Sequence, residues 1–165
     1  MSSAVSHNGA DRSTTALAGS GTCTRVQVDP RGPRFGGAVT TVVLAVALVL
    51  VGTTAGTALI AWQTLVFALG ALIGLHAQPY GIVFRHLIRP RLGPPAELED
   101  AAPPRFAQAV GLVFLLVALL ASLLGVTALA TVAVAFALAA AFLNAAFDFC
   151  LGCEVYLLAR RLRHA

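Results

Sequence analysis

The sequence predicts an all-α membrane protein with four transmembrane helices. Of its 165 residues, 58% are hydrophobic and only 11% are charged, and the mean hydropathy is +0.86. Soluble domains carry roughly a quarter charged residues, so this composition excludes an ordinary soluble domain. Four apolar stretches can cross ~30 Å of hydrocarbon at ~1.5 Å per residue, the first only with help from its flanking residues. They cover residues 38–51, 58–75, 106–124 and 126–147.

The segment before the first stretch differs from the rest of the chain. Residues 1–28 are rich in Ser, Thr, Ala and Gly and contain no apolar run. We expect a disordered cytoplasmic tail and no signal peptide. Cys23 lies in this tail, and it is expected to be a free thiol because proteins facing the cytoplasm rarely carry structural disulfides.

The arginines predict the orientation of the chain. All 11 basic residues are arginines, and they flank the spans at three places, whereas the connections 52–57 and 125–127 carry no charge. The positive-inside rule therefore places both termini and the central loop in the cytoplasm, as in a multi-pass protein of the plasma membrane. The pI near 9.6 then reflects headgroup anchoring and not nucleic-acid binding. The arginines are Arg12, Arg25, Arg31 and Arg34, then Arg85, Arg89, Arg91 and Arg105, and finally Arg160, Arg161 and Arg163.

The two halves of the chain begin alike. Residues 29–39 align with residues 100–110 at an offset of 71, with Asp, Pro-Arg-Phe and Ala-Val in register, and Phe84 later falls opposite Tyr156. This pattern predicts an internal repeat of one helical hairpin, over about 29–90 and about 100–162, joined by a stiff acidic linker at 91–99. Because each unit has two spans, the chain returns to the same side of the membrane, and the two repeats are parallel. Chance similarity between apolar segments is the alternative.

The two hairpins are expected to end differently. Pro79 should stop the second span, and a basic interfacial helix should follow over 81–89. The second hairpin has no proline at that place, so its last helix is predicted to continue past the membrane through Asp148 and Cys153 to about Leu162.

Cys150 and Cys153 are the main candidates for chemistry. Cys150 lies about 36 Å along a helix from residue 126, just past the hydrocarbon. Cysteines at i and i+3 share a helix face at a Cα separation of ~5 Å, so the pair could form a disulfide or hold a persulfide. Asp148 and Glu154 are expected to modulate the pair.

The expected electrostatics favour neutral thiols. In the predicted long helix, the pair lies in the C-terminal half, where the helix dipole and the two carboxylates raise a thiol pKa. Activation would then require an arginine of the other hairpin, Arg34 or Arg105. Simple packing of two small apolar side chains is the alternative. A zinc site is a weaker one, because two thiolates need His86, His164 or a second subunit to complete the shell.

Other polar residues in the spans are expected to be structural. Gln63 and Asn144 should be buried and bond between helices, and Trp62 should lie in the aromatic belt near the outer end of its span. No charged residue lies near mid-membrane, and no motif indicates a nucleotide, haem or other cofactor.

Four motifs stand out along the chain. They are Asp-Pro-Arg-x-Pro-Arg-Phe at 29–35, Pro-Tyr at 79–80 with Phe-Arg at 84–85, Arg-Pro-Arg-Leu-Gly-Pro-Pro at 89–95, and Cys-Leu-Gly-Cys-Glu at 150–154. Together they resemble the motifs of a bacterial membrane family, common in actinobacteria, that is catalogued as domain of unknown function 4395. The resemblance covers about 28–162. The family has no established activity, but the resemblance implies neighbours of thioredoxin-like or rhodanese-type sulfurtransferase character.

The resulting expectation is an integral membrane component of thiol-disulfide or persulfide metabolism. Its partners would be the lipid bilayer and a cytoplasmic thioredoxin-like or rhodanese-type protein. The alternatives are a non-catalytic scaffold that docks a partner and a homo-oligomeric channel for a small sulfur compound.

Overall fold

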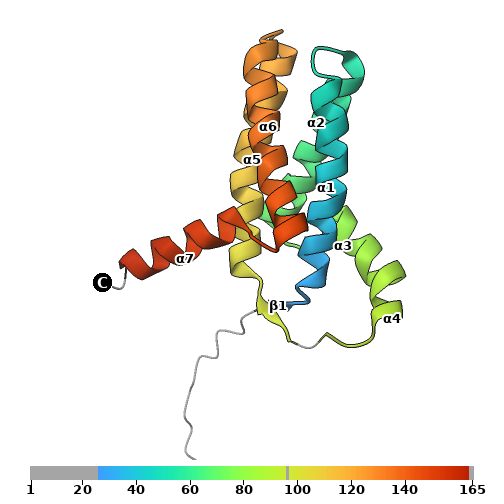
Figure 1. The fold of residues 1–165 in the computed structure, drawn as a ribbon, viewed down its shortest axis with the longest axis vertical. Helices are drawn as coiled ribbons and strands as arrows, with labels where there is room; N and C mark the ends of the chain where they lie inside the picture. Colours follow the sequence, from blue (N-terminus) through green and yellow to red (C-terminus); the bar gives the residue numbers. More distant parts are fainter. Residues whose placement is uncertain (1–25, 96, 164–165) are drawn as a thin grey trace, which may run out of the picture.

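The computed structural model describes residues 26–95 and 97–163 and contains a bundle of four long helices (Figure 1). All four are long and apolar enough to cross a membrane, so the protein is an all-α, multi-pass membrane protein as predicted. Cys23, His164 and most of the predicted tail lie outside the described residues. The long helices are α1 (Arg31–Val49), α2 (Thr54–Ala68) with its π-helical continuation η1 (Leu69–Ile73), α5 (Ala102–Leu123) and α6 (Thr127–Phe147).

Two tight turns form the hairpins. Gly52 and Gly125 each adopt a positive φ, 87° and 74°, which a residue without Cβ reaches without strain. After the first turn, the Thr53 hydroxyl accepts a hydrogen bond of 3.1 Å from the backbone N–H of Gly56 and so caps α2.

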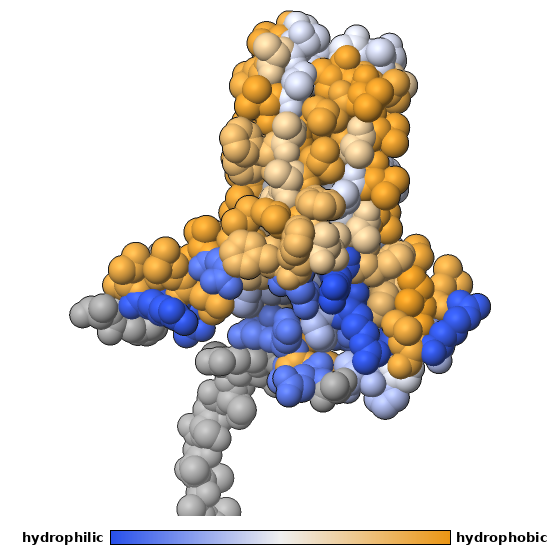
Figure 2. Space-filling view, viewed as in Figure 1, coloured by the Kyte–Doolittle hydropathy of each residue, from blue (hydrophilic) through white to orange (hydrophobic). Residues whose placement is uncertain are grey.

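The four long helices form a closed ring in which each contacts two neighbours. α1 contacts α2 and α6, and α5 contacts α6 and α2. The fully buried residues of the bundle include one large apolar side chain from each long helix, namely Leu44, Ile60, Leu115 and Val134. Valine, leucine and phenylalanine side chains cover the outside of the shaft, and Figure 2 shows this hydrophobic surface above a hydrophilic end, which we call the base. The surface is compatible with lipid.

A buried polar chain ties three helices together. Gln63 donates to the Thr40 hydroxyl at 2.9 Å and accepts from the Tyr80 hydroxyl at 2.9 Å, which confirms its predicted inter-helix role. Trp62 donates to Tyr80 at 3.1 Å. The place of Trp62 in an outer aromatic belt stays a prediction. Asn144 is only partly buried, so its predicted burial is wrong.

Two shorter helical segments leave the bundle at the base, on opposite sides (Figure 1). The first runs through α3 (Pro79–Val83), η2 (Phe84–Ile88) and α4 (Arg89–Leu92), and the second is α7 (Leu151–Arg163). In Figure 2, α7 shows a hydrophobic upper side and a hydrophilic lower side, as expected for a helix at a membrane interface.

The predicted continuous helix from residue 126 to about Leu162 is wrong. α6 ends at Phe147, and Asp148 adopts a left-handed conformation with φ 58° and ψ 22°. Asp is one of the few side chains that tolerates this conformation, so it ends a helix where neither Pro nor Gly is present. Both hairpins therefore end in a break followed by a separate helix.

The two hairpins repeat several local contacts. Asp29 accepts from the backbone N–H of Arg31, and Asp100 accepts from that of Ala102, each at 3.0 Å. The ring pairs Phe35–Phe84 and Phe106–Tyr156 have centroid distances of 5.9 and 5.7 Å. These residues correspond in the predicted repeat, which itself stays a prediction.

A short antiparallel ribbon joins the two hairpins at the base. It pairs β1 (Gln27–Val28) with β2 (Glu99–Asp100). Within the predicted tail, residues 27–28 form a strand, and within the predicted linker, α4 reaches Leu92 and residue 99 belongs to β2. The division of the chain into tail, repeats and linker stays a prediction.

Candidate functional site: a thiol pair at the start of α7

The break at Asp148 puts Cys150 at the N-terminus of a helix. The Cys150 carbonyl accepts the first helical hydrogen bond of α7, from the N–H of Glu154 at 3.0 Å, so Cys150 occupies the N-cap position. Cys153 lies in the first turn of α7. Both cysteines are free and half-buried. The prediction that the pair lies in the C-terminal half of a helix is wrong. The helix dipole therefore favours the thiolate, opposite to the predicted effect.

The surroundings of Cys150 stabilise its thiolate. A hydrogen bond from the Cys153 thiol, helped by the backbone N–H groups of Cys153 and Gly152, lowers the pKa of Cys150 to about 7. Burial and the nearby Glu154 carboxylate oppose this shift. Sulfur thus takes the place of the oxygen that usually accepts from these N–H groups at a helix N-cap.

Cys153 titrates in the other direction. Its hydrogen bond to Cys150 and its burial raise the pKa of the Cys153 thiol well above the ordinary value, and the negative charges near it, Cys150, Glu99 and Glu154, add to the effect. Around neutral pH, Cys153 therefore keeps its proton while Cys150 loses its own. Such an asymmetry separates an attacking thiolate from a resolving thiol.

The two arginines expected to activate the pair have other roles. Arg34 lies 3.6 Å from the Asp148 carboxylate and donates to the Ala145 carbonyl at 3.5 Å, so it binds the end of α6. Arg105 donates to the carbonyls of Ala71 and Leu72, at 3.0 and 3.4 Å, at the end of η1. Neither arginine contributes to the lowered pKa of Cys150. Each one instead binds the helix end of the opposite hairpin.

α7 is held against α5 at a very close approach. A Cβ atom added to Gly152 would lie 2.5 Å from the Cα of Ala107, so only glycine permits this contact. One turn further, Tyr156 packs on Phe106. These contacts fix the first turn of α7, where both cysteines lie.

A family model described as a domain of unknown function (DUF4395) matches residues 28–161. The chain belongs to this family. No curated protein and no solved structure matches the chain.

In this member of the DUF4395 family, the described residues offer no further ligands for a metal ion beside the two thiols. Within residues 26–95 and 97–163, no group of three or more His, Cys, Asp and Glu side chains could hold a metal ion. His86 belongs to η2, in the segment that leaves the bundle on the opposite side from α7 (Figure 1).

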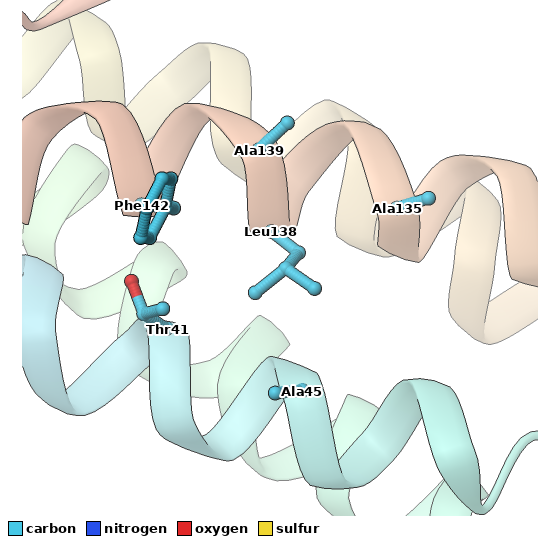
Figure 3. A pocket seen from close by; sticks show the side chains of 6 residues that line it. All are labelled: Thr41, Ala45, Ala135, Leu138, Ala139 and Phe142. Carbon is cyan, nitrogen blue, oxygen red and sulfur yellow. The ribbon is translucent and has the colours of Figure 1, made fainter.

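An apolar pocket of about 400 Å³ lies between α1 and α6 on the shaft of the bundle (Figure 3). Its one hydroxyl, on Thr41, donates to the Gly37 carbonyl of its own helix at 2.8 Å. The pocket has no free polar group for a ligand, and a lipid chain is the natural occupant.

Proposed function

We propose that this protein is a membrane component of thiol-disulfide or persulfide exchange, with Cys150 as the attacking thiolate and Cys153 as the resolving thiol. The observation that carries the proposal is the position of Cys150 at the N-cap of α7, where the Cys153 thiol and, to a smaller extent, the backbone N–H groups of Cys153 and Gly152 lower its pKa to about 7. A thiol with a pKa near ambient pH is the most effective attacker in exchange reactions.

In disulfide exchange, the Cys150 thiolate attacks one sulfur of a substrate disulfide and releases the other sulfur as a thiolate. Cys153 then loses its proton to water and attacks Cys150 in the mixed disulfide. This second step releases the remaining substrate thiolate and forms a Cys150–Cys153 disulfide, so the substrate gains the two electrons that the pair loses. Residues three apart in a helical turn lie close enough for this bond.

In persulfide transfer, Cys150 takes the outer sulfur of a donor persulfide and leaves the donor as a thiol. Attack of Cys153 on the inner sulfur, that of Cys150, then releases hydrosulfide and forms the same disulfide. A cytoplasmic thioredoxin-like protein would reduce this disulfide, and a rhodanese-type sulfurtransferase would supply the persulfide. The arginines at the base favour a cytoplasmic location of both termini and of the thiol pair.

The test is labelling of the full chain with a membrane-impermeant maleimide, in inverted vesicles and in intact spheroplasts, with and without prior reduction. We expect labelling of Cys150 from the cytoplasmic side only, and more labelling after reduction. A Cys150→Ser variant should lose this labelling. All measurements use a Cys23→Ser background, so that the third thiol of the chain does not contribute. Thiols that stay reduced and cannot be labelled from either side would instead mean that the pair only packs, and the proposal would be wrong.

A further inference from the structure

A large cavity at the base is lined by neither Cys150 nor Cys153. It has a volume of about 920 Å³, which is typical of small-ligand sites. Its walls come from the ribbon β1–β2, the starts of α1 and α5, the turn after η1, the α3–η2 segment and one face of α7. The base around it is the hydrophilic end of the molecule in Figure 2. The cavity therefore brings together both hairpins and both interfacial helices.

Positive charge dominates the walls of this base cavity. Four arginines line it, Arg85, Arg89, Arg105 and Arg160, against two aspartates, Asp29 and Asp100.

Each aspartate accepts one backbone N–H bond of 3.0 Å. The second oxygen of Asp29 is buried without a hydrogen-bond partner among the described residues, and its charge is balanced only by Arg89, at 4.0 Å. Among the described residues, the guanidinium groups of Arg85, Arg105 and Arg160 have no carboxylate within 4.0 Å. They leave an uncompensated positive charge facing a cavity.

Two of these three arginines are held in place by the backbone. Arg85 donates to the His76 carbonyl at 2.7 Å, and Arg105 donates to the Ala71 carbonyl at 3.0 Å. A guanidinium group has five N–H donors, so each arginine keeps several for a ligand. Because they are already ordered, binding costs less conformational entropy.

We propose that the base cavity is a phosphate-binding site, with Arg85, Arg105 and Arg160 as the groups that hold the phosphate. The forked guanidinium group matches phosphate oxygens in geometry as well as charge. The remaining wall is largely apolar and includes Ile73 and Phe84, which suits the carbon part of a phosphate ester.

Two sources of the phosphate group fit this position. The cavity lies where η1 ends and α5 begins, at the level where lipid headgroups meet the bundle, so a phospholipid of the same leaflet can reach it. A soluble phosphate monoester can enter from the aqueous side. The proposal does not depend on the thiol chemistry.

The experiment is a calorimetric titration of the full chain in a neutral detergent. The probes are short-chain phosphatidylglycerol and glycerol 3-phosphate, with glycerol as the phosphate-free control. Arg160→Gln is the test variant, because Arg160 makes no side-chain hydrogen bond within the described residues and its loss should not disturb the fold. Arg161→Gln is the matched control, since Arg161 carries the same charge on the same helix outside the cavity.

We expect Arg160→Gln to weaken binding about tenfold, as for one lost charge-assisted contact, and Arg161→Gln to change it less than about twofold. Binding of both probes would support recognition of the phosphate itself, binding of the lipid alone a headgroup site, and binding of glycerol 3-phosphate alone a soluble ligand. The proposal is overturned if neither probe binds with a Kd below about 1 mM, or if the two variants weaken binding equally.

Discussion

At the scale of single residues, the chemistry of the thiol pair depends on which cysteine holds the proton. The hydrogen bond from Cys153 is the largest contribution to the lowered pKa of Cys150. Alkylation of Cys150 by iodoacetamide should therefore rise through a midpoint at about pH 7, whereas Cys153 should stay unreactive over the same range because its pKa is raised. Mass spectrometry of the alkylated peptides at a series of pH values measures both profiles.

The matched variant for this profile is Cys153→Ala. Removing the thiol donor should move the Cys150 pKa upward, towards the ordinary ~8.5, and so lower its alkylation rate at pH 7 by roughly tenfold. The pH midpoint must move with the rate, because lower accessibility alone would slow the reaction without shifting the midpoint. An unchanged midpoint in this variant would contradict the assigned role of Cys153.

At the scale of elements, the left-handed residue at 148 decides where α6 ends and α7 begins. Asp148→Gly should preserve the break, because glycine adopts φ 58° without cost, whereas Asp148→Val should lose ~1–2 kcal/mol of unfolding free energy. The valine variant should also raise the Cys150 pKa, since an extended α6 would remove the N-cap. Thermal unfolding and the alkylation profile measure these effects. Equal behaviour of the two variants would mean that the backbone at 148 does not set the site.

The close contact of Gly152 with α5 should be just as sensitive to substitution. Gly152→Val should push α7 away from Ala107 and accelerate the alkylation of Cys153, because a Cβ at this position would lie 2.5 Å from backbone. Gly36→Ala is the control where α1 faces Gln78 and Tyr80, since a Cβ there would have no heavy atom closer than 3.9 Å. Slow alkylation of Cys153 in the valine variant would show that this crossing does not hold α7.

The break before α7 is also what the sequence could not predict. Apolar stretches were sufficient for the four spans. Pro79 was expected to stop the second span, but the span already ends at Ile73, where Gly74 adopts φ 136°, and Pro79 instead begins α3. Asp148 follows an apolar run that contains no Pro or Gly, and the next glycine, Gly152, comes only after the break, so the usual signals of a helix end are missing there. The spacing of Cys150 and Cys153 did identify the candidate pair. The direction of the electrostatics depended on the break and was therefore predicted with the wrong sign.

At the scale of the whole molecule, the two hairpins hold each other at the base and along the shaft. The interfaces α1–α6 and α2–α5 both lie between hairpins. Arg34 binds the end of α6, Arg105 binds the end of η1, and β1 pairs with β2. Only the segment from Gly93 to Leu98, between α4 and β2, connects the hairpins covalently. The assembly should therefore depend on packing between the hairpins and not on the connection.

We expect a chain cut between Pro94 and Pro95 to assemble when both fragments are produced in the same cell. An affinity tag on the first fragment should recover the second in equal amount, because the cut lies in a surface connection that makes few contacts.

The matched variant combines Arg34→Gln and Arg105→Gln in the cut chain, which removes both arginine contacts between the hairpins while all apolar packing remains. This variant should reduce the recovered second fragment several-fold, and the same two substitutions in the uncut chain should leave its yield nearly unchanged, since the linker keeps the hairpins at high effective concentration. Recovery of the first fragment alone from the cut wild-type chain would show that the connection, and not the interfaces, holds the two halves together.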